Sequence, residues 1–75
     1  MNLIKECRTA LGMTQEQLAE KAECSTRSIR NYEAGTQMPT AQTIIRIAKV
    51  LKTTVESLYK ENAVEAVGRN GGAGN

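Results

Sequence analysis

Residues 25–31 carry side chains that can form hydrogen bonds with nucleic acid. Thr26, Arg27, Arg30 and Asn31 have the spacing of one exposed helix face. Arginine can bind guanine through two hydrogen bonds at once, and asparagine can bind adenine in the same way. Recognition of base edges is therefore the first candidate chemistry, and an ordinary solvated helix face is the alternative.

Two short helices, over residues 15–22 and 26–33, are expected to position this face. The first begins at a capping box, in which Thr14 and Gln17 each satisfy the other's backbone N–H group. The second begins at Ser25, because a serine hydroxyl can accept a hydrogen bond from the first turn of a helix. The capping residues thus separate two helices by a turn of a few residues.

The turn between these helices has the spacing of a helix-turn-helix. Ala19 is small enough to let two helices cross closely, Glu23 lies in the turn, and Ile29 follows on the second helix. The polar side chains of residues 26–31 then lie on the outer face of the second helix. This arrangement indicates a module that binds another molecule with that face.

Three further helices are expected, which makes the chain all-α. Ile4, Cys7 and Leu11 have helical spacing before Gly12 ends the first helix. Thr40 is expected to cap the fourth helix, and Thr54 the fifth. The apolar stripe of the fourth helix consists of Ile44, Ile45, Ile47, Ala48 and Leu51. The inward face of the fifth consists of Val55, Leu58 and Tyr59.

The 75 residues have room for one domain. Residues 1–60 are expected to fold as a compact five-helix domain, in which the fifth helix could extend to residue 67. The apolar cluster at residues 63–67 is interpreted either as frayed or as a contact with a second subunit. Residues 68–75 are rich in glycine and have nothing to bury, so we expect a disordered tail.

The composition argues against an enzyme or a metal site. The chain has no His, which is the commonest general acid–base and metal ligand, and its two cysteines cannot complete a four-ligand zinc site. We therefore expect no catalytic residue, cofactor or metal. No apolar run approaches the length of a membrane span. Cys7 and Cys24 occupy apolar positions, so reduced thiols buried in the core are favoured over a disulfide.

From about Leu3 to Lys60 the sequence resembles the Cro/phage-repressor (Xre-type) helix-turn-helix family. The resemblance rests on residues 13–19 (MTQEQLA), on residues 25–35 (STRSIRNYEAG), and on Pro39 followed by an apolar helix. Each stretch alone is a weak signal, whereas all three in this order are a strong one. The resemblance implies a lambda-repressor-like domain that binds double-stranded DNA through its third helix.

The resemblance also implies roles for individual residues. Those expected to contact bases are Thr26, Arg27, Arg30 and Asn31. Those expected to contact phosphates are Gln15, Ser25, Thr36 and Gln37, with a simple helix-forming role as the alternative for Gln15. Arg8 and Glu33 occupy positions that form a structural ion pair in family members.

Two residues depart from the family pattern. Glu23 and Lys52 stand in turns where the family commonly has glycine. A left-handed backbone conformation at a residue other than glycine costs on the order of 1 kcal/mol. We therefore expect either this cost or an altered turn.

The leading hypothesis is a sequence-specific transcriptional regulator, a repressor, of a prokaryotic cell, phage or mobile element. It would act in the cytoplasm as a homodimer on a near-palindromic operator, with no membrane partner. The alternative is an antitoxin-like or adaptor module that acts through protein–protein binding. The net charge of +2 is small, and the cations of the fourth helix either solubilise the chain or attract DNA from a distance.

Overall fold

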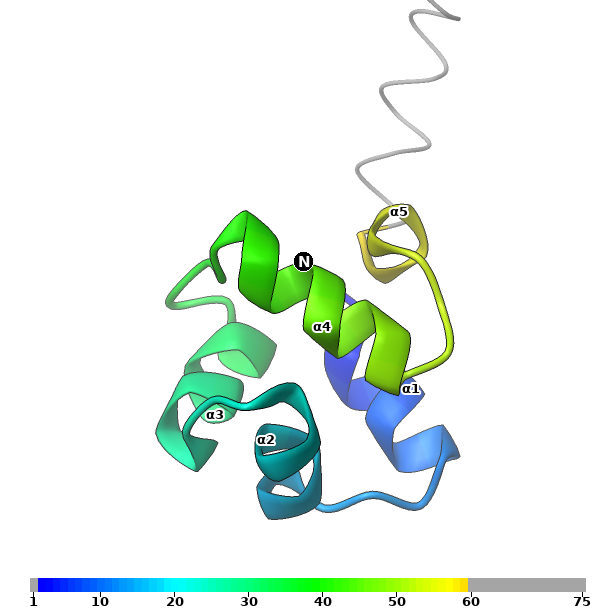
Figure 1. Cartoon of the computed structure of the whole chain (residues 1–75), viewed down its shortest axis with the longest axis horizontal. Coiled ribbons are helices and arrows are strands. Elements are labelled where there is room, and N and C mark those ends of the chain that lie inside the picture. Colours follow the sequence, from blue (N-terminus) through cyan, green and yellow to red (C-terminus); the bar gives the residue numbers. More distant parts are fainter. Residues whose placement is uncertain (1, 60–75) are drawn as a thin grey trace, which may run out of the picture.

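Residues 2–59, the part of the chain that the computed structural model describes, form five helices and no strand (Figure 1). The helices are α1 (Ile4–Ala10), α2 (Gln15–Ala22), α3 (Thr26–Ala34), α4 (Ala41–Val50) and α5 (Val55–Leu58). The predicted all-α, five-helix fold class is therefore confirmed. The predicted continuation of the last helix to residue 67 and the predicted tail at residues 68–75 lie outside the described residues.

Hydroxyl side chains set the first residue of four of these helices. The capping oxygens belong to Thr14, Ser25, Thr40 and Thr54, and each accepts the backbone N–H of the third residue that follows it. The capping box of α2 is complete, because Gln17 Oε1 also accepts the backbone N–H of Thr14 at 2.9 Å. The starts of α2 and α3 are therefore the predicted ones, and α3 ends one residue later than predicted.

The start of α1 is fixed by contacts that the sequence analysis did not predict. Asn2 Oδ1 accepts the backbone N–H of Ile4 at 3.0 Å, and Asn2 Nδ2 donates to the carbonyl of Tyr32 at the end of α3. The backbone N–H of Leu3 donates to the carbonyl of Leu58 at 2.7 Å. These bonds join the N-terminal segment to α3 and α5.

The core lies where α2, α3 and α4 meet, with α1 and α5 closing its remaining sides (Figure 1). Helix α2 packs against both α3 and α4, α1 packs against α3, and α5 packs against α4. The fully buried large side chains are Ile4, Leu18, Ile29, Ile47 and Leu58. One such residue comes from each helix, so all five helices contribute to a single core.

Two residues predicted to be apolar core positions are exposed. Ile45 is 48% exposed, because Ile44, Ile47 and Ala48 already fill the buried side of α4 and the side chain of Ile45 lies on its flank. Leu11 is 43% exposed, because α1 ends at Ala10 and the helical spacing no longer governs the next residue. The buried faces of α1 and α4 are therefore narrower than the sequence pattern suggested.

Both cysteines are free thiols, as expected, but neither is fully buried. Cys7 and Cys24 are half-buried and pack against the edge of the core. No helix among residues 2–59 is both long enough and apolar enough to span a membrane.

Candidate nucleic-acid interface

Helices α2 and α3 form a compact pair joined by a tight turn. Ala19 is 3% exposed at the contact between them, and its carbonyl accepts the backbone N–H of Cys24 at 2.9 Å. Glu23 ends α2 with a φ of 61°, in the left-handed region. Ser25 then caps α3 immediately after the turn. The chain therefore keeps the helix-turn-helix geometry with a glutamate in the strained position, and the turn is not altered.

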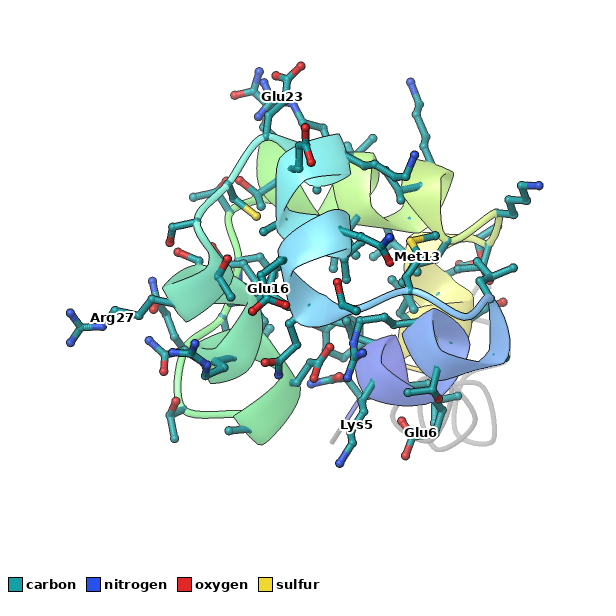
Figure 2. All side chains as sticks on the ribbon, turned by 90° about the horizontal axis from the view of Figure 1, so that it is seen from below. Lys5, Glu6, Met13, Glu16, Glu23 and Arg27 are labelled. Atoms are coloured by element: carbon teal, nitrogen blue, oxygen red, sulfur yellow. The ribbon has the colours of Figure 1, made fainter. Side chains whose placement is uncertain are left out.

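The outward side of α3 carries the residues that the sequence analysis singled out. Arg27 and Arg30 are exposed, whereas Thr26 and Asn31 are half-buried beside them. Figure 2 shows the Arg27 side chain extending away from the body of the domain. Neither arginine takes part in an ion pair with any other residue of the described segment. Both guanidinium groups are therefore available to a ligand.

A buried ion pair fixes the far end of α3. Arg8 Nε lies 2.6 Å from Glu33 Oε2, and the two side chains are only 10% and 5% exposed. Arg8 Nη2 donates to Glu33 Oε1 at 3.3 Å, and Arg8 Nη1 donates to the carbonyl of Met13 at 2.8 Å. This is the pair that the family resemblance implied. It ties α1 to α3 and to the segment that leads into α2.

The same carboxylate also holds the first residue of α2. Gln15 Nε2 donates to Glu33 Oε1 at 3.1 Å. Glu33 thus accepts hydrogen bonds from side chains of α1 and α2 while it lies on α3. An amide NH₂ group has two hydrogens, so Gln15 keeps one donor for another acceptor. The contact between Gln15 and Glu33 could not be predicted from the sequence, because nothing in the spacing of the two residues indicates it.

The loop that follows α3 folds back onto that helix. Gly35 has a φ of 80°, which lets the chain reverse direction without a side-chain clash. The backbone N–H and the hydroxyl of Thr36 both donate to the carbonyl of Asn31, at 3.0 and 3.3 Å. Asn31 Nδ2 donates to Gln37 Oε1 at 3.2 Å. Thr36 and Gln37, both exposed, therefore lie next to the end of the proposed reading face.

Ser25 serves as a cap in this structure. Its hydroxyl oxygen accepts the backbone N–H of Ser28 at 3.0 Å, and its hydroxyl donates to Ser28 Oγ at 3.0 Å. The backbone N–H groups of the first helical turn that a cap does not satisfy remain free, and they carry the positive end of the helix dipole. Ser28, which shares both hydrogen bonds with Ser25, is half-buried.

Charges around the turn differ from those on α3. Glu16 and Glu20 are exposed on α2, and Glu23 Oε1 lies 3.9 Å from Arg46 Nε of α4. Figure 2 shows Glu16 on the outer side of α2 and Glu23 at the end of that helix. Burial raises the pKa of the Cys24 thiol, and the nearby Arg46 guanidinium opposes this shift. Among the described residues, the two arginines without an ion pair therefore lie on α3, whereas three of the glutamates lie on α2 and in the turn.

Comparison with known proteins identifies the family. The helix-turn-helix family model matches residues 4–58, which include all five helices. The chain is 33% identical over 51 residues to a cryptic phage CTXphi transcriptional repressor, RstR, of Vibrio cholerae, which covers 68% of this chain and 46% of that protein. It is 30% identical over 64 residues to the uncharacterized HTH-type transcriptional regulator YqaE of Bacillus subtilis, which covers 85% of this chain and 55% of that protein.

A third relative has a length closer to that of this chain. An uncharacterized HTH-type transcriptional regulator of Archaeoglobus fulgidus is 36% identical over 56 residues, which cover 75% of this chain and 80% of that protein. The chain spans about half the length of the Vibrio and Bacillus relatives. No solved structure gives a significant match. On the family match and the arrangement of α2 and α3, the chain belongs to the Cro/C1-type, Xre-like helix-turn-helix family.

Proposed function

We propose that this chain is the DNA-binding part of a transcriptional regulator, a repressor, and that it reads a specific double-stranded sequence through α3. The observation that carries the proposal is the exposed polar face of α3, which stands within a helix-turn-helix of an established family. The relatives named as a repressor and as transcriptional regulators support the same function. A recognition helix enters the major groove with its N-terminal residues toward the bases.

The base contacts are assigned to Thr26, Arg27, Arg30 and Asn31. Arg27 lies in the first turn of α3, is exposed and has no partner among the described residues, so its guanidinium is suited to a guanine edge. Asn31 has the donor and the acceptor that adenine requires. Arg30 is also exposed and lies on the same helix, where it can reach a base or an adjacent phosphate.

The phosphate contacts are assigned to Gln15, Ser25, Thr36 and Gln37. Gln15 stands in the first turn of α2, where the helix dipole favours an anion, and Glu33 holds its amide with one hydrogen to spare. Ser25 and Gln37 would contribute mainly through backbone N–H groups, since both use their side chains within the domain. Both donors of Thr36 bind the carbonyl of Asn31, so its hydroxyl would have to release that carbonyl to reach a phosphate. These contacts would set the register of α3 without reading sequence.

The regulator would bind as a homodimer to a near-palindromic operator in the cytoplasm of a prokaryotic cell. A two-fold symmetric protein presents its two reading helices to half-sites about 34 Å apart, which is one turn of DNA. The experiment is selection of bound duplexes from a random pool. A symmetric enriched site would support the homodimer, and a wild-type protein that enriches no sequence at low salt would refute the proposal.

Two variants distinguish a contact with a base from a contact with a phosphate. Arg27→Ala should lose about 1–3 kcal/mol of binding free energy at the selected site and relax the preference at one base pair. Gln15→Ala should weaken binding to selected and scrambled duplexes by the same factor. Lys5→Ala removes the same charge from α1, outside the proposed contacts, and serves as the control for Arg27. A base-dependent effect of Gln15→Ala would contradict its assignment to a phosphate.

A further inference from the structure

The side chain of Gln37 forms a hydrogen bond with a residue that is assigned to the DNA bases. Asn31 Nδ2 donates to Gln37 Oε1 at 3.2 Å, although Gln37 lies beyond the end of α3. Within the described residues this is the one hydrogen bond between the side chain of a proposed base-reading residue of α3 and a side chain of the loop that follows. The loop therefore acts directly on a group that is assigned to the DNA bases.

Several contacts hold this loop against Asn31. The left-handed conformation of Gly35 turns the chain back, and the carbonyl of Asn31 then accepts both the backbone N–H and the hydroxyl of Thr36. Two successive loop residues thus bind the backbone and the side chain of the same residue. The acceptor oxygen of Gln37 is consequently held near Asn31 by more than its own hydrogen bond.

The chemistry of a carboxamide explains why this contact matters. To bind adenine with two hydrogen bonds, Asn31 must present its oxygen and the amide hydrogen on the same side as that oxygen. The second amide hydrogen points the other way and can bind Gln37 without disturbing the edge that reads the base. A free asparagine can also turn its amide over, which exchanges donor and acceptor. An acceptor fixed next to Nδ2 opposes that rotation.

We propose that Gln37 is a positioning residue that fixes the amide orientation of Asn31, and thereby makes α3 selective for adenine at one position of the half-site. This inference rests on the proposed function, since it assumes that Asn31 faces the bases. It assigns to the Gln37 side chain a role in specificity, which is distinct from a contact of its backbone with phosphate.

The test compares base preferences of matched variants by selection from a random duplex pool. Gln37→Met keeps the side-chain length but removes the acceptor, and Asn31→Ala removes the reading group. Asn31→Ala should lower the preference for adenine at one position by about fivefold to a hundredfold, the range of one bidentate base contact. Gln37→Met should lower the same preference by about twofold to tenfold, the net effect of one hydrogen bond. Preference at every other position should remain unchanged.

Two controls sharpen the comparison. Gln42 is another exposed glutamine, on α4, and its side chain forms no hydrogen bond within residues 2–59, so Gln42→Met should leave every preference unchanged. Gln37→Glu restores an acceptor at the same chain length, so it should retain the adenine preference while binding all duplexes more weakly because of its negative charge. In the free protein, the side-chain NH₂ signals of Asn31 in a ¹⁵N–¹H spectrum should shift in Gln37→Met and not in Gln42→Met.

The outcomes separate this inference from the proposed function. A wild-type protein that enriches no site would refute both. A selected wild-type site combined with a Gln37→Met variant that binds all duplexes more weakly, but keeps its adenine preference, would overturn this inference alone. The double variant Asn31→Ala/Gln37→Met should show the base preferences of Asn31→Ala. A further loss of preference at another position would also overturn the inference.

Discussion

Replacement of Glu33 by glutamine tests how strongly the fold depends on the buried ion pair. The change keeps the size of the side chain but removes the charge that faces Arg8, whose side chain is 10% exposed. Loss of one partner of a buried pair costs about 3–5 kcal/mol, whereas an exposed pair contributes about 0–1 kcal/mol. Arg8 retains its bond to the carbonyl of Met13, and glutamine retains one acceptor oxygen. We therefore expect a loss of about 3 kcal/mol, the lower end of the buried range.

This loss is large relative to the stability of so small a domain. At about 0.05–0.15 kcal/mol per residue, a domain of this size has a free energy of unfolding of about 3–9 kcal/mol. The Glu33→Gln variant should therefore unfold at a much lower urea concentration, and part of it could be unfolded without urea. Replacement of both partners by apolar residues, Arg8→Met with Glu33→Leu, removes both charges. That double variant should be more stable than Glu33→Gln, since no charge remains buried without a partner.

Urea unfolding followed by circular dichroism would measure these differences. The comparison needs wild type, Glu33→Gln, Arg8→Met and the double variant Arg8→Met/Glu33→Leu, together with Glu56→Gln as a control. Glu56 is an exposed carboxylate on α5, and its replacement should change the free energy of unfolding by less than about 0.5 kcal/mol. If Glu33→Gln lost no more than this control, the pair would behave as a surface pair and the reasoning from burial would be refuted.

Three further predictions concern the turns, the caps and the thiol. Glu23→Gly should raise the free energy of unfolding by up to about 1 kcal/mol. The strain of a left-handed glutamate costs more than the extra unfolded-state entropy of glycine and the lost exposed contact with Arg46 together. A thermal melt that shows destabilisation would contradict this. Thr40→Ala removes the cap of α4 and should cost about 1 kcal/mol in a urea melt without changing the selected DNA site. Burial raises the pKa of Cys24 in the folded state, so stability should be constant at lower pH and fall as pH rises past the ordinary thiol pKa of about 8.5. In Cys24→Ala the decrease in stability should begin at higher pH, where ionisation of Tyr59, whose pKa is also raised by burial, lowers the stability in the same way. An unchanged dependence of stability on pH would contradict the role of the Cys24 thiol.

The starts of α2, α3, α4 and α5 could be predicted from the sequence because their signals are local. A hydroxyl at Ser25 or Thr40 acts on a backbone N–H three residues away, and no other part of the chain has to be known. The same holds for Gly35, whose left-handed conformation ends α3. Local chemistry of this kind explains why the bounds of α2 and α3 matched the prediction to within one residue.

The width of the buried face could not be predicted in the same way. Ile44 and Ile45 are neighbours in sequence and equally apolar, and the choice between them depends on where α2 and α5 lie against α4. Cys24 fits the apolar pattern, yet it remains half-buried because it precedes α3 at the edge of the core. Periodicity identifies the side of a helix that is apolar, and only packing decides how much of it is covered.

Some polar contacts of the candidate site could be predicted from the sequence, and others could not. Residue types and family spacing indicated the face of α3 and the pair of Arg8 with Glu33. The bonds from Gln15 to Glu33 and from Asn31 to Gln37 join residues on different segments, so they required the three-dimensional structure. The pair of Asn31 and Gln37 does have a weak sequence signal, because two amides lie six residues apart across a glycine that reverses the chain.

The distribution of charge determines how salt should affect the binding of DNA. All four residues assigned to phosphates are uncharged, and the net charge of the whole chain is only +2. Salt weakens binding to DNA in proportion to the number of phosphates that lysine and arginine neutralise, because only those contacts release condensed cations. The acidic groups of α2 further reduce attraction at long range. A domain of this composition should therefore bind with a weak dependence on salt, and should obtain its preference for one sequence from the orientation of the Arg27 and Asn31 side chains.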